Sequence, residues 1–303
     1  MNDMNFRELL YVQMIFEERS ITRAAEKLHI AQPSLSKFLS ALESKQGYRI
    51  FDRSTTPLSL TEEGAEYLKT VRTILNLSQD LERKIGEIHD LQRGSLHVGI
   101  PMARAFYSLP EVLPRFMSLY PGIRIFITEA PASELEEQIL QGKLDLIIID
   151  GSVSSDELSG EVLTEVSLYL VTPPGYLDVR TSHRDILARV PQEKQKFVLL
   201  HRGQYFRELA EKIFLEYAMQ PEVLLETQMA DTAVKLCAQG LGMTFVSDFV
   251  KENVIFRISP DYYRLNERFS SPVSAFWRKN CYLPRAARPF IAVFKDYLLQ
   301  PRP

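Results

Sequence analysis

Residues 20–42, SITRAAEKLHIAQPSLSKFLSAL, constrain the fold more than any other stretch, because they have the pattern of two short helices joined by a tight turn. Ser20 predicts a helix over 21–28, since its hydroxyl can accept a hydrogen bond from an unpaired backbone N–H at a helix start. His29 occupies the turn and is among the residue types enriched in the left-handed backbone region. Pro33 opens the second helix, where its missing N–H would have no partner in any case.

The second helix has two different faces. Leu35, Leu39 and Leu42 recur at the spacing of a stripe that faces a core. The opposite side carries small polar residues and a single charge, whereas solvated helix faces are usually rich in Glu and Lys. A recognition helix contacts bases with residues near its N-terminus. We therefore expect a DNA-binding helix-turn-helix, and the alternative is an ordinary helical hairpin packed inside a domain. The outward residues are Gln32, Ser34, Ser36, Lys37 and Ser40.

The next residues predict a β-wing beside this helix pair. Residues 48–53 form an expected strand, 54–57 a turn and 58–60 a return strand. Arg53 and the hydroxyls of the turn could reach phosphates or the minor groove. A helix over about 5–18 is expected to buttress the pair with its apolar residues, which are Phe6, Leu9, Leu10, Ile15 and Phe16.

The charge pattern is consistent with DNA binding only when it is examined locally. The whole chain has a formal net charge of −3 and a pI near 6.0, which do not indicate a nucleic-acid partner. Residues 19–53, however, contain seven basic and three acidic side chains, a local excess of +4. A concentrated basic patch is the relevant electrostatic feature of a DNA-binding surface.

The run AAEKLHIAQPSLSKFLSALE, followed by GYRIFDRSTTPLSLTEEG, resembles the N-terminal domain of the LysR-type transcriptional regulators. The resemblance is dense over roughly the first sixty-five residues and looser to the C-terminus. It implies DNA contacts by the recognition helix and by the wing arginine. Phe38 stands where the family usually has a polar residue. Lys37 stands where Arg is more frequent, and Lys lacks the bidentate fork of Arg. The candidate DNA-binding residues are Thr22, Gln32, Pro33, Ser34, Ser36, Lys37, Arg53 and Thr56.

A long helix is expected over 61–91, where no proline interrupts the chain. Thirty helical residues span about 45 Å, too far for their apolar seam to be buried by a domain of sixty residues. Pairing with a second copy is therefore expected, and packing on its own chain is the alternative. The seam residues are Val71, Ile74, Ser78, Leu81, Ile85 and Ile88.

After residue 93, strands alternate with helices, a pattern that predicts parallel sheets covered by helices. Strands are expected at 95–100, 123–128, 144–150, 165–173, 196–201, 223–227, 242–247, 253–258 and 272–279, and helices at 107–120, 133–141, 204–219, 231–239 and 284–299. The resemblance implies two lobes like those of periplasmic solute-binding proteins. The expected fold is α+β and multidomain. It comprises a winged helix-turn-helix over 1–60, a linker helix over 61–93, lobe I over 94–165 and 276–303, and lobe II over 166–275.

A small-molecule effector site is expected where the strands end, because open α/β sheets bind ligands outside their carboxyl edges. Two of these strand ends lead directly into helix N-termini, which favour anions. We therefore expect a small-molecule effector and favour an anionic one over a neutral one. Ala103 and Ala132 occupy places where relatives often carry a Ser or Thr that binds the effector. The candidate effector-binding residues are Pro101, Met102, Arg104, Ala132, Ser133, His201, Arg202 and Ser247.

Other functions are less well supported. Cys237 and Cys281 cannot form a metal site alone; Cys237 is expected in a core, with a redox switch as the alternative. Asp145 and Asp150 flank a strand, and no catalytic motif is present. We expect no cofactor, no metal and no enzyme activity. An enzyme built on the two-lobed fold is the least favoured of the alternative functions. No apolar run could span a membrane and no signal peptide is apparent, so a cytoplasmic protein is expected.

The expected function is therefore sequence-specific transcriptional regulation under the control of an effector bound between two lobes. A homodimer formed by 61–91 would recognise double-stranded DNA at an interrupted dyad operator, and the resemblance implies a homotetramer. The alternative is a two-lobed small-molecule sensor that acts through protein partners rather than DNA.

Overall fold

The computed structural model describes residues 5–89, 94–177 and 186–300. The chain divides into two compact units, 1–89 and 90–303, and each is described by itself. Positions 90–93 of the expected linker, including the end of the helix expected to reach 91, lie outside the described residues, as do the last three residues of lobe I. None of the described helices is long and apolar enough to cross a membrane.

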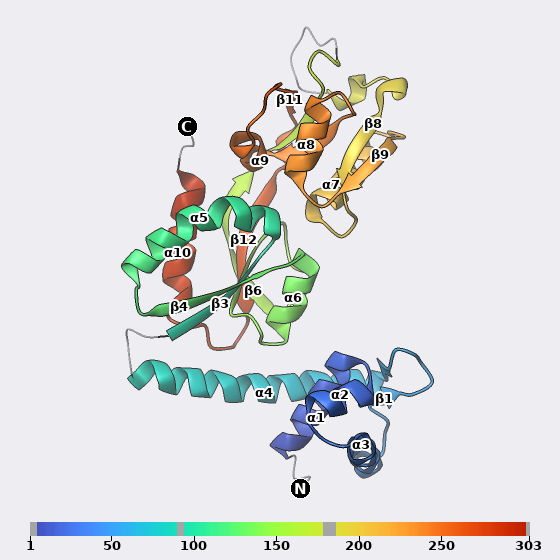
Figure 1. The fold of residues 1–303 in the computed structure, drawn as a ribbon, viewed down its shortest axis with the longest axis vertical. Coiled ribbons are helices and arrows are strands. Elements are labelled where there is room, and N and C mark those ends of the chain that lie inside the picture. Colours follow the sequence, from blue (N-terminus) through green and yellow to red (C-terminus); the bar gives the residue numbers. More distant parts are fainter. Residues whose placement is uncertain (1–4, 90–93, 178–185, 301–303) are drawn as a thin grey trace. The chain divides into compact units, whose positions relative to one another are not determined.

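The first unit is a winged helix-turn-helix followed by one long helix (Figure 1). Strands β1 and β2 pair antiparallel and form the wing. The apolar face of α1 consists of Leu9, Val12 and Ile15, which are buried, whereas Phe6 and Leu10 are exposed and do not buttress the helix pair as expected. The elements are α1 (Phe6–Glu18), α2 (Ile21–Lys27), α3 (Gln32–Gln46), β1 (Phe51–Asp52), β2 (Ser59–Leu60) and α4 (Glu62–His89).

Local backbone chemistry sets the turns of this unit. The Ser20 hydroxyl accepts from the backbone N–H of Arg23 at the start of α2, as predicted. His29 has φ 54°, so the left-handed turn that joins α2 to α3 is also as predicted. Gly64 lies in the first turn of α4, where a Cβ atom would come within 1.9 Å of the Ile50 carbonyl oxygen. Only glycine therefore allows α4 to start this close to the wing.

The apolar residues of helix α4 differ in burial between its two halves. Val71 and Leu75 are buried in the core of the first unit, and Ile74 packs against that core. The first residues of the seam, Val71 and Ile74, therefore pack within their own chain, which was the alternative to pairing with a second copy. Further along, Leu77, Leu81 and Ile85 are 55%, 58% and 47% exposed. Side-chain burial of Ile88 lies outside the described residues.

The second unit contains two lobes, of which the first is built on a five-stranded sheet in the order β4-β3-β5-β12-β6. Strands β3, β4 and β5 run parallel, and β12 pairs antiparallel with β5 and β6. Helices α5 and α10 share one core with this sheet, and α6 lies in a second core cluster with β5. The elements are β3 (Gly94–Ile100), α5 (Met102–Leu119), β4 (Ile123–Glu129), α6 (Ala132–Leu140), β5 (Leu146–Asp150), β6 (Leu158–Val166), β12 (Ser271–Arg278) and α10 (Ala287–Leu299).

The second lobe comprises an antiparallel sheet, β10-β7-β11, and a parallel pair, β8-β9. A parallel bridge from Phe197 to Met243 joins them. The elements are β7 (Leu168–Thr172), η2 (Leu187–Arg189), η3 (Gln192–Lys194), β8 (Lys196–Leu200), α7 (Tyr205–Glu216), β9 (Glu222–Thr227), α8 (Ala230–Ala238), β10 (Thr244–Ser247), α9 (Asp248–Asn253), β11 (Asp261–Arg264) and η4 (Glu267–Phe269).

Three strand predictions need correction. Strand β12 pairs with β6 from Ser271 and with β5 from Val273, so the chain has returned to the first lobe at Ser271 rather than near 276. The strand expected at 253–258 is wrong, because α9 runs to 253 and the strand lies at Asp261–Arg264. Strand β6 was not expected over its full length, because its sequence mixes polar with apolar residues and includes Gly160, and so does not form an apolar run. The ring of Phe276 covers Gly160, where a Cβ atom would lie 2.3 Å from it.

Two further features differ from expectation. The sheet around β7 is antiparallel, whereas parallel strands were predicted throughout. Helix α5 begins at Met102 rather than near 107, with Pro101 at its N-cap and Pro110 and Pro114 inside the helix. Met102 and Arg104 therefore project from the first turn of a helix rather than from a loop.

Candidate nucleic-acid interface and effector pocket

The recognition helix presents its predicted DNA-contacting residues to solvent. Gln32, Pro33, Ser34 and Lys37 are exposed in the first half of α3, and Ser36 is half-buried. Thr22 is exposed on α2, and Arg53 and Thr56 are exposed on the wing. Pro33, Lys37 and Ser40 are spaced by four and three residues, so they share one side of the helix.

Phe38 does not belong to this outer surface. Its ring packs edge-on against Tyr11 of α1, with centroids 5.1 Å apart and planes at 90°. Aromatic pairs favour this geometry. Phe38 therefore joins α3 to α1 rather than contributing to the outer surface.

The basic excess around the helix pair is smaller than its formal count. Lys27 and Arg23 both lie against Glu18, at 2.5 and 3.7 Å. The hydrogen bond and charge of Glu18 raise the pKa of Lys27. Arg53 pairs with Glu43 at 2.8 Å, and Glu43 is buried. The sequence indicated Glu43 only as one acid among several basic residues, and its contact with the wing was missed.

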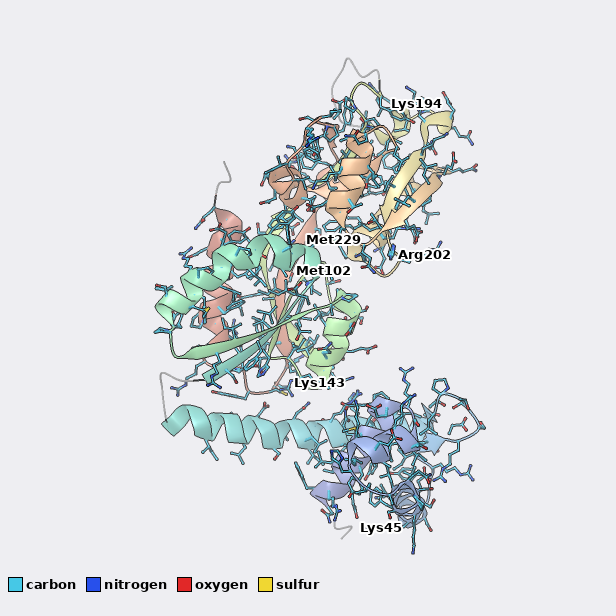
Figure 2. All side chains as sticks on the ribbon, viewed as in Figure 1. Lys45, Met102, Lys143, Lys194, Arg202 and Met229 are labelled. Carbon is cyan, nitrogen blue, oxygen red and sulfur yellow. The ribbon has the colours of Figure 1, made fainter. Side chains whose placement is uncertain are left out.

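The second unit contains a pocket of about 560 Å³ lined by residues of both lobes. Met102 from α5 and Met229, which precedes α8, contribute to it from the first and second lobes (Figure 2). All eight predicted effector-binding residues are among the lining residues: Pro101, Met102, Arg104, Ala132, Ser133, His201, Arg202 and Ser247. Volumes of this size are usual for sites that hold small molecules.

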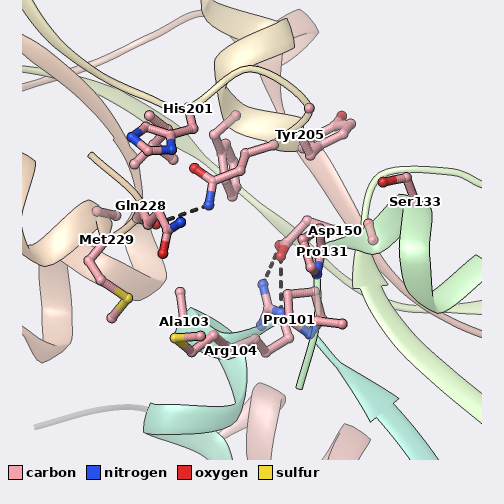
Figure 3. Close-up of a pocket in the computed structure, with 18 of the residues that line it drawn as sticks. Pro101, Ala103, Arg104, Pro131, Ser133, Asp150, His201, Tyr205, Gln228 and Met229 are labelled. Carbon is pink, nitrogen blue, oxygen red and sulfur yellow. Dashed lines mark hydrogen bonds and ion pairs between the residues drawn. The ribbon is translucent and has the colours of Figure 1, made fainter. Parts of the chain in front are cut away.

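Several lining residues were not predicted from the sequence. Tyr205, Phe206 and Phe249 add aromatic surface, and Gln228 and Met229 come from the segment between β9 and α8 (Figure 3). The Gln204 side-chain amide donates to the Gln228 carbonyl at 3.0 Å, which joins the segments after β8 and β9. Most of these residues are aromatic or apolar, whereas the sequence-based prediction relied on charged and hydroxyl groups at strand ends.

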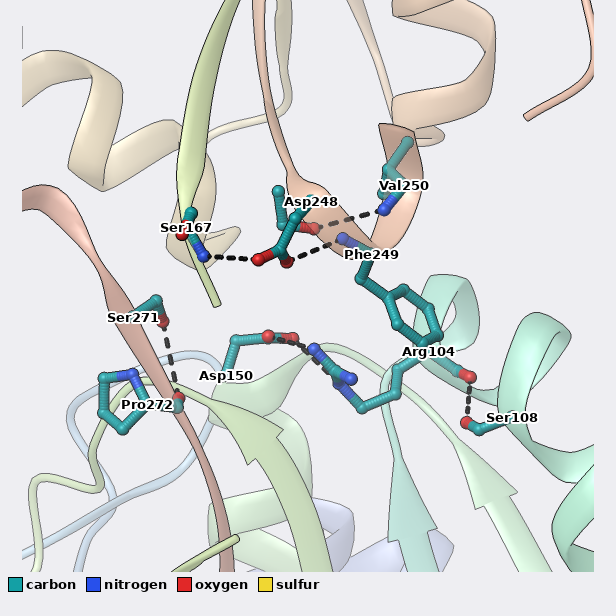
Figure 4. A network of polar contacts seen from close by, with 10 residues as sticks. Arg104, Ser108, Asp150, Ser167, Asp248, Phe249, Val250, Ser271 and Pro272 are labelled. Carbon is teal, nitrogen blue, oxygen red and sulfur yellow. Dashed lines mark hydrogen bonds and ion pairs between the residues drawn. The ribbon is translucent and has the colours of Figure 1, made fainter. Parts of the chain in front are cut away.

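A buried ion pair lies at the edge of the pocket in the first lobe. Arg104 is only 3% exposed, and its Nε donates to Asp150 Oδ2 at 3.2 Å. A second bond joins Arg104 Nη2 to Asp150 Oδ1 (Figure 4). The guanidinium also lies over the Phe249 ring, 4.8 Å from its centroid, and Nη1 is buried without a hydrogen-bond partner among the described residues. Asp150 therefore compensates the charge of Arg104.

The pocket does not have the excess of positive charge that the sequence suggested. Arg202 is 81% exposed and lies 3.7 Å from Glu211. The described lining residues include two arginines, Arg104 and Arg202, against three carboxylates, Glu129, Glu134 and Asp150. An anion would therefore meet no uncompensated buried cation among them.

Polar contacts connect the two lobes beside the pocket. Tyr107 of α5 donates its hydroxyl to Asp231, at the start of α8, and its ring packs edge-on against Phe249. Burial raises the pKa of Tyr107, and the hydrogen bond to Asp231 raises it further by a smaller amount. At the crossing between the lobes, Asp248 Oδ2 accepts from the Ser167 backbone N–H at 2.9 Å. These contacts hold one particular arrangement of the lobes.

The remaining candidate groups do not form a reactive centre. Cys237 is fully buried, and burial raises the pKa of its thiol to about 12, so it is protonated at neutral pH. Asp145 binds the backbone N–H of His97 at 2.8 Å, while Asp150 binds Arg104, so the two acids do not converge. Among the described residues, no group of three or more His, Cys, Asp or Glu side chains could hold a metal ion.

Comparison with known proteins gives consistent matches for both units. The family model "LysR substrate binding domain" matches residues 89–299, and "Bacterial regulatory helix-turn-helix protein, lysR family" matches residues 6–65. The chain is 26% identical to the uncharacterized HTH-type transcriptional regulator YcgK of Bacillus subtilis, over 98% of this chain and 96% of that protein.

Solved structures show the same fold. A full-length OxyR variant from Pseudomonas aeruginosa aligns with a TM-score of 0.67 at 23% identity, covering 98% of this chain and 95% of that one. Full-length CbnR in complex with its target DNA aligns with a TM-score of 0.58 at 22% identity, covering 97% and 98%. The matches extend over both units in each case.

Proposed function

Because this chain belongs to the LysR family of DNA-binding transcriptional regulators, we propose that it binds a specific operator sequence and that a small molecule held between its two lobes controls this binding. One observation carries the proposal. Eight residues predicted from strand ends far apart in the sequence line one pocket of about 560 Å³, in the unit that matches the substrate-binding family model.

The lining indicates the chemistry of the proposed effector. Apolar side chains, aromatic and thioether groups among them, form a large part of the wall, and the buried guanidinium of Arg104 is already neutralised by Asp150. Burying an anion beside a compensated pair would carry a desolvation cost without a full counter-charge. We therefore favour an effector with an apolar body, no net negative charge and a hydrogen-bond acceptor for the buried Arg104 Nη1.

The proposed assembly is a dimer formed through the second half of α4. Leu77, Leu81 and Ile85 expose apolar surface along a helix whose first half is already packed. Two paired copies would present two recognition helices to an interrupted dyad site. A Leu81→Asp variant is expected to lose both dimerisation, measured by sedimentation, and operator binding, while Leu215→Asp at an exposed position of α7 retains them.

Further pairing to a tetramer would use the lobes. Apolar residues are exposed on both of them, in the first lobe at Met117, Leu119 and Phe126, and in the second at Val223, Leu224 and Leu225. The effector would act by favouring one lobe arrangement over another, because a ligand shifts an equilibrium only by its difference in affinity for the two states. The Tyr107–Asp231 contact is one interaction that such a change would keep or break.

Selection of bound sequences from a randomised duplex pool with the full chain tests whether the protein binds DNA specifically. We expect enrichment of a sequence with two related half-sites, and binding that weakens steeply as salt rises, because phosphate contacts release counterions. Gln32→Ala should relax the selected sequence, whereas Gln239→Ala in the second unit should leave it unchanged. If no sequence is enriched, or binding is insensitive to salt, the alternative of a sensor acting through protein partners is favoured.

A further inference from the structure

A hollow lies in the first unit between the second half of α3 and the base of the wing. Its volume is about 530 Å³, and we call it the wing-base hollow. Its lining combines two arginines with two serine hydroxyls, a set of groups suited to phosphate oxygens. The lining residues are Ser40, Glu43, Ser44, Gly47, Tyr48, Arg49 and Arg53.

The hollow continues the side of α3 that carries the predicted DNA contacts. Pro33, Lys37, Ser40 and Ser44 are spaced by four, three and four residues, which places them along one stripe of the helix. The N-terminal part of that stripe is the part expected in the major groove. A duplex that follows the stripe toward the wing brings its sugar–phosphate backbone to the hollow.

Glu43 holds the arginine at the edge of this hollow. It is a buried carboxylate, 8% exposed, and its Oε1 accepts from the backbone N–H groups of Ile50 at 2.8 Å and Phe51 at 3.2 Å. Its Oε2 accepts from Arg53 Nη2 at 2.8 Å, and the same nitrogen lies 3.3 Å from the Ser40 hydroxyl. One carboxylate thus fixes both the strand that starts the wing and the guanidinium on it.

We propose that the wing-base hollow seats a DNA backbone phosphate between Arg53 and Arg49, and that Glu43 is the positioning residue that aims Arg53 at it. The inference rests on the DNA binding described above. Arg53 remains 38% exposed, so part of its guanidinium faces solvent while Nη2 is held. A held side chain loses less rotamer freedom when it binds than a free one, which favours the bound geometry.

The nearby negative charge of Glu43 makes the proposal testable, because two effects oppose each other. As a simple like charge, Glu43 would repel the phosphate, and its neutralisation would tighten DNA binding. As a positioning residue, its neutralisation would weaken binding. Glu43→Gln separates the two, since the amide oxygen can still accept from Ile50 and Phe51, whereas the amide nitrogen cannot accept from Arg53.

The experiment measures the affinity of the full chain for its selected duplex over a range of salt concentrations. Glu43→Gln and Arg53→Met are each expected to weaken binding about tenfold, as loss of a charge-assisted bond does, and to lower the slope of log K against log salt by about one. The double variant should weaken binding no further than Arg53→Met alone, because Glu43 acts through Arg53.

Two controls keep the outcomes distinct. Glu26→Gln removes one exposed acid of the same unit without touching the wing, and it should leave the slope unchanged. Arg49→Met alters an exposed side chain, should fold normally, and should lower the slope by about one even if Glu43→Gln fails to fold.

The outcomes that overturn the inference are specific. Tighter binding by Glu43→Gln would show that it acts as a competing charge. Additive losses in the double variant would show a structural role independent of Arg53. An unchanged salt slope in both Arg49→Met and Arg53→Met would show that no phosphate occupies the hollow. Wild-type binding that still depends on salt would leave the DNA-binding function intact in each of these cases.

Discussion

The two candidate sites of this chain use charge in opposite ways. On the first unit, Lys37 is an exposed charge on a helix whose stability comes from the leucines of its other face. In the second unit, Arg104 is 3% exposed and paired with Asp150 at the edge of the pocket. An exposed charge can be changed with little effect on folding, whereas a buried pair is part of the fold that shapes the site. The contribution of Lys37 to recognition is therefore separable from stability, whereas that of the Arg104–Asp150 pair is not.

Arg104→Met should give the largest effect on stability. It leaves Asp150 in a largely buried place without its partner, a change expected to cost about 3–5 kcal/mol of unfolding free energy. Trp277, the single tryptophan, lies on β12 of the same unit, so its fluorescence in a denaturant titration reports the loss.

Arg115→Met is the matched control for that prediction. Arg115 is on the same helix and pairs with Asp296 at 3.1 Å, but the two side chains are 44% and 60% exposed. Its loss is expected to cost about 1 kcal/mol or less. The double variant Arg104→Met/Asp150→Leu should regain most of the lost stability. If Arg104→Met cost no more than Arg115→Met, the buried pair would not be part of the fold in the sense argued above.

Cys237 should give an intermediate effect that depends on pH. Burial raises the pKa of its thiol from 9.0 to about 12 in the folded chain, so folding favours the protonated form. Its contribution to stability is therefore complete below pH about 9 and is lost as pH rises through about 12. Burial raises the pKa of Tyr262 too, and its charge shift acts in the same direction.

Thiol alkylation in a Cys281→Ser variant checks this assignment. Cys237 should resist iodoacetamide at neutral pH until the second unit unfolds, because the thiolate is the reactive species. A Cys237→Ser variant, which retains the half-buried Cys281, is the comparison and should be labelled faster. Equal labelling rates at neutral pH in the folded state would contradict the burial on which the prediction rests.

The same contrast explains which features the sequence could predict. The helix-turn-helix depends on local chemistry, such as Ser20 at a helix start and His29 in a left-handed turn, and both were predicted correctly. Pairing of Arg104 with Asp150 depends on residues 46 positions apart, brought together by the register of β3 and β5. Strand ends could therefore be predicted to meet, while the partner that neutralises Arg104 could not.

Packing between elements was equally hidden from local patterns. Phe38 was conspicuous in the sequence as an apolar residue where the family usually has a polar one, but its explanation is the Tyr11 ring of another helix. Return of the chain to the first lobe at Ser271 depends on hydrogen bonding of β12 to β6, a strand whose mixed polar sequence gave little indication of its length. In both cases, the deciding contact involves a residue distant in the chain.

Lys37→Met should give the smallest effect on stability and a clear effect on DNA binding. Methionine forms helices about as well as lysine, and Lys37 is exposed, so the unfolding free energy should change by no more than about 0.5 kcal/mol. The slope of log K against log salt for the selected duplex should fall by about one, because one phosphate contact is lost. Lys212→Met, the same substitution at an exposed position of α7 in the second unit, should change neither quantity. A loss of stability in Lys37→Met as large as that in Arg104→Met would remove the distinction between the two sites, whereas a changed sequence preference with an unchanged slope would assign Lys37 to a base rather than to a phosphate.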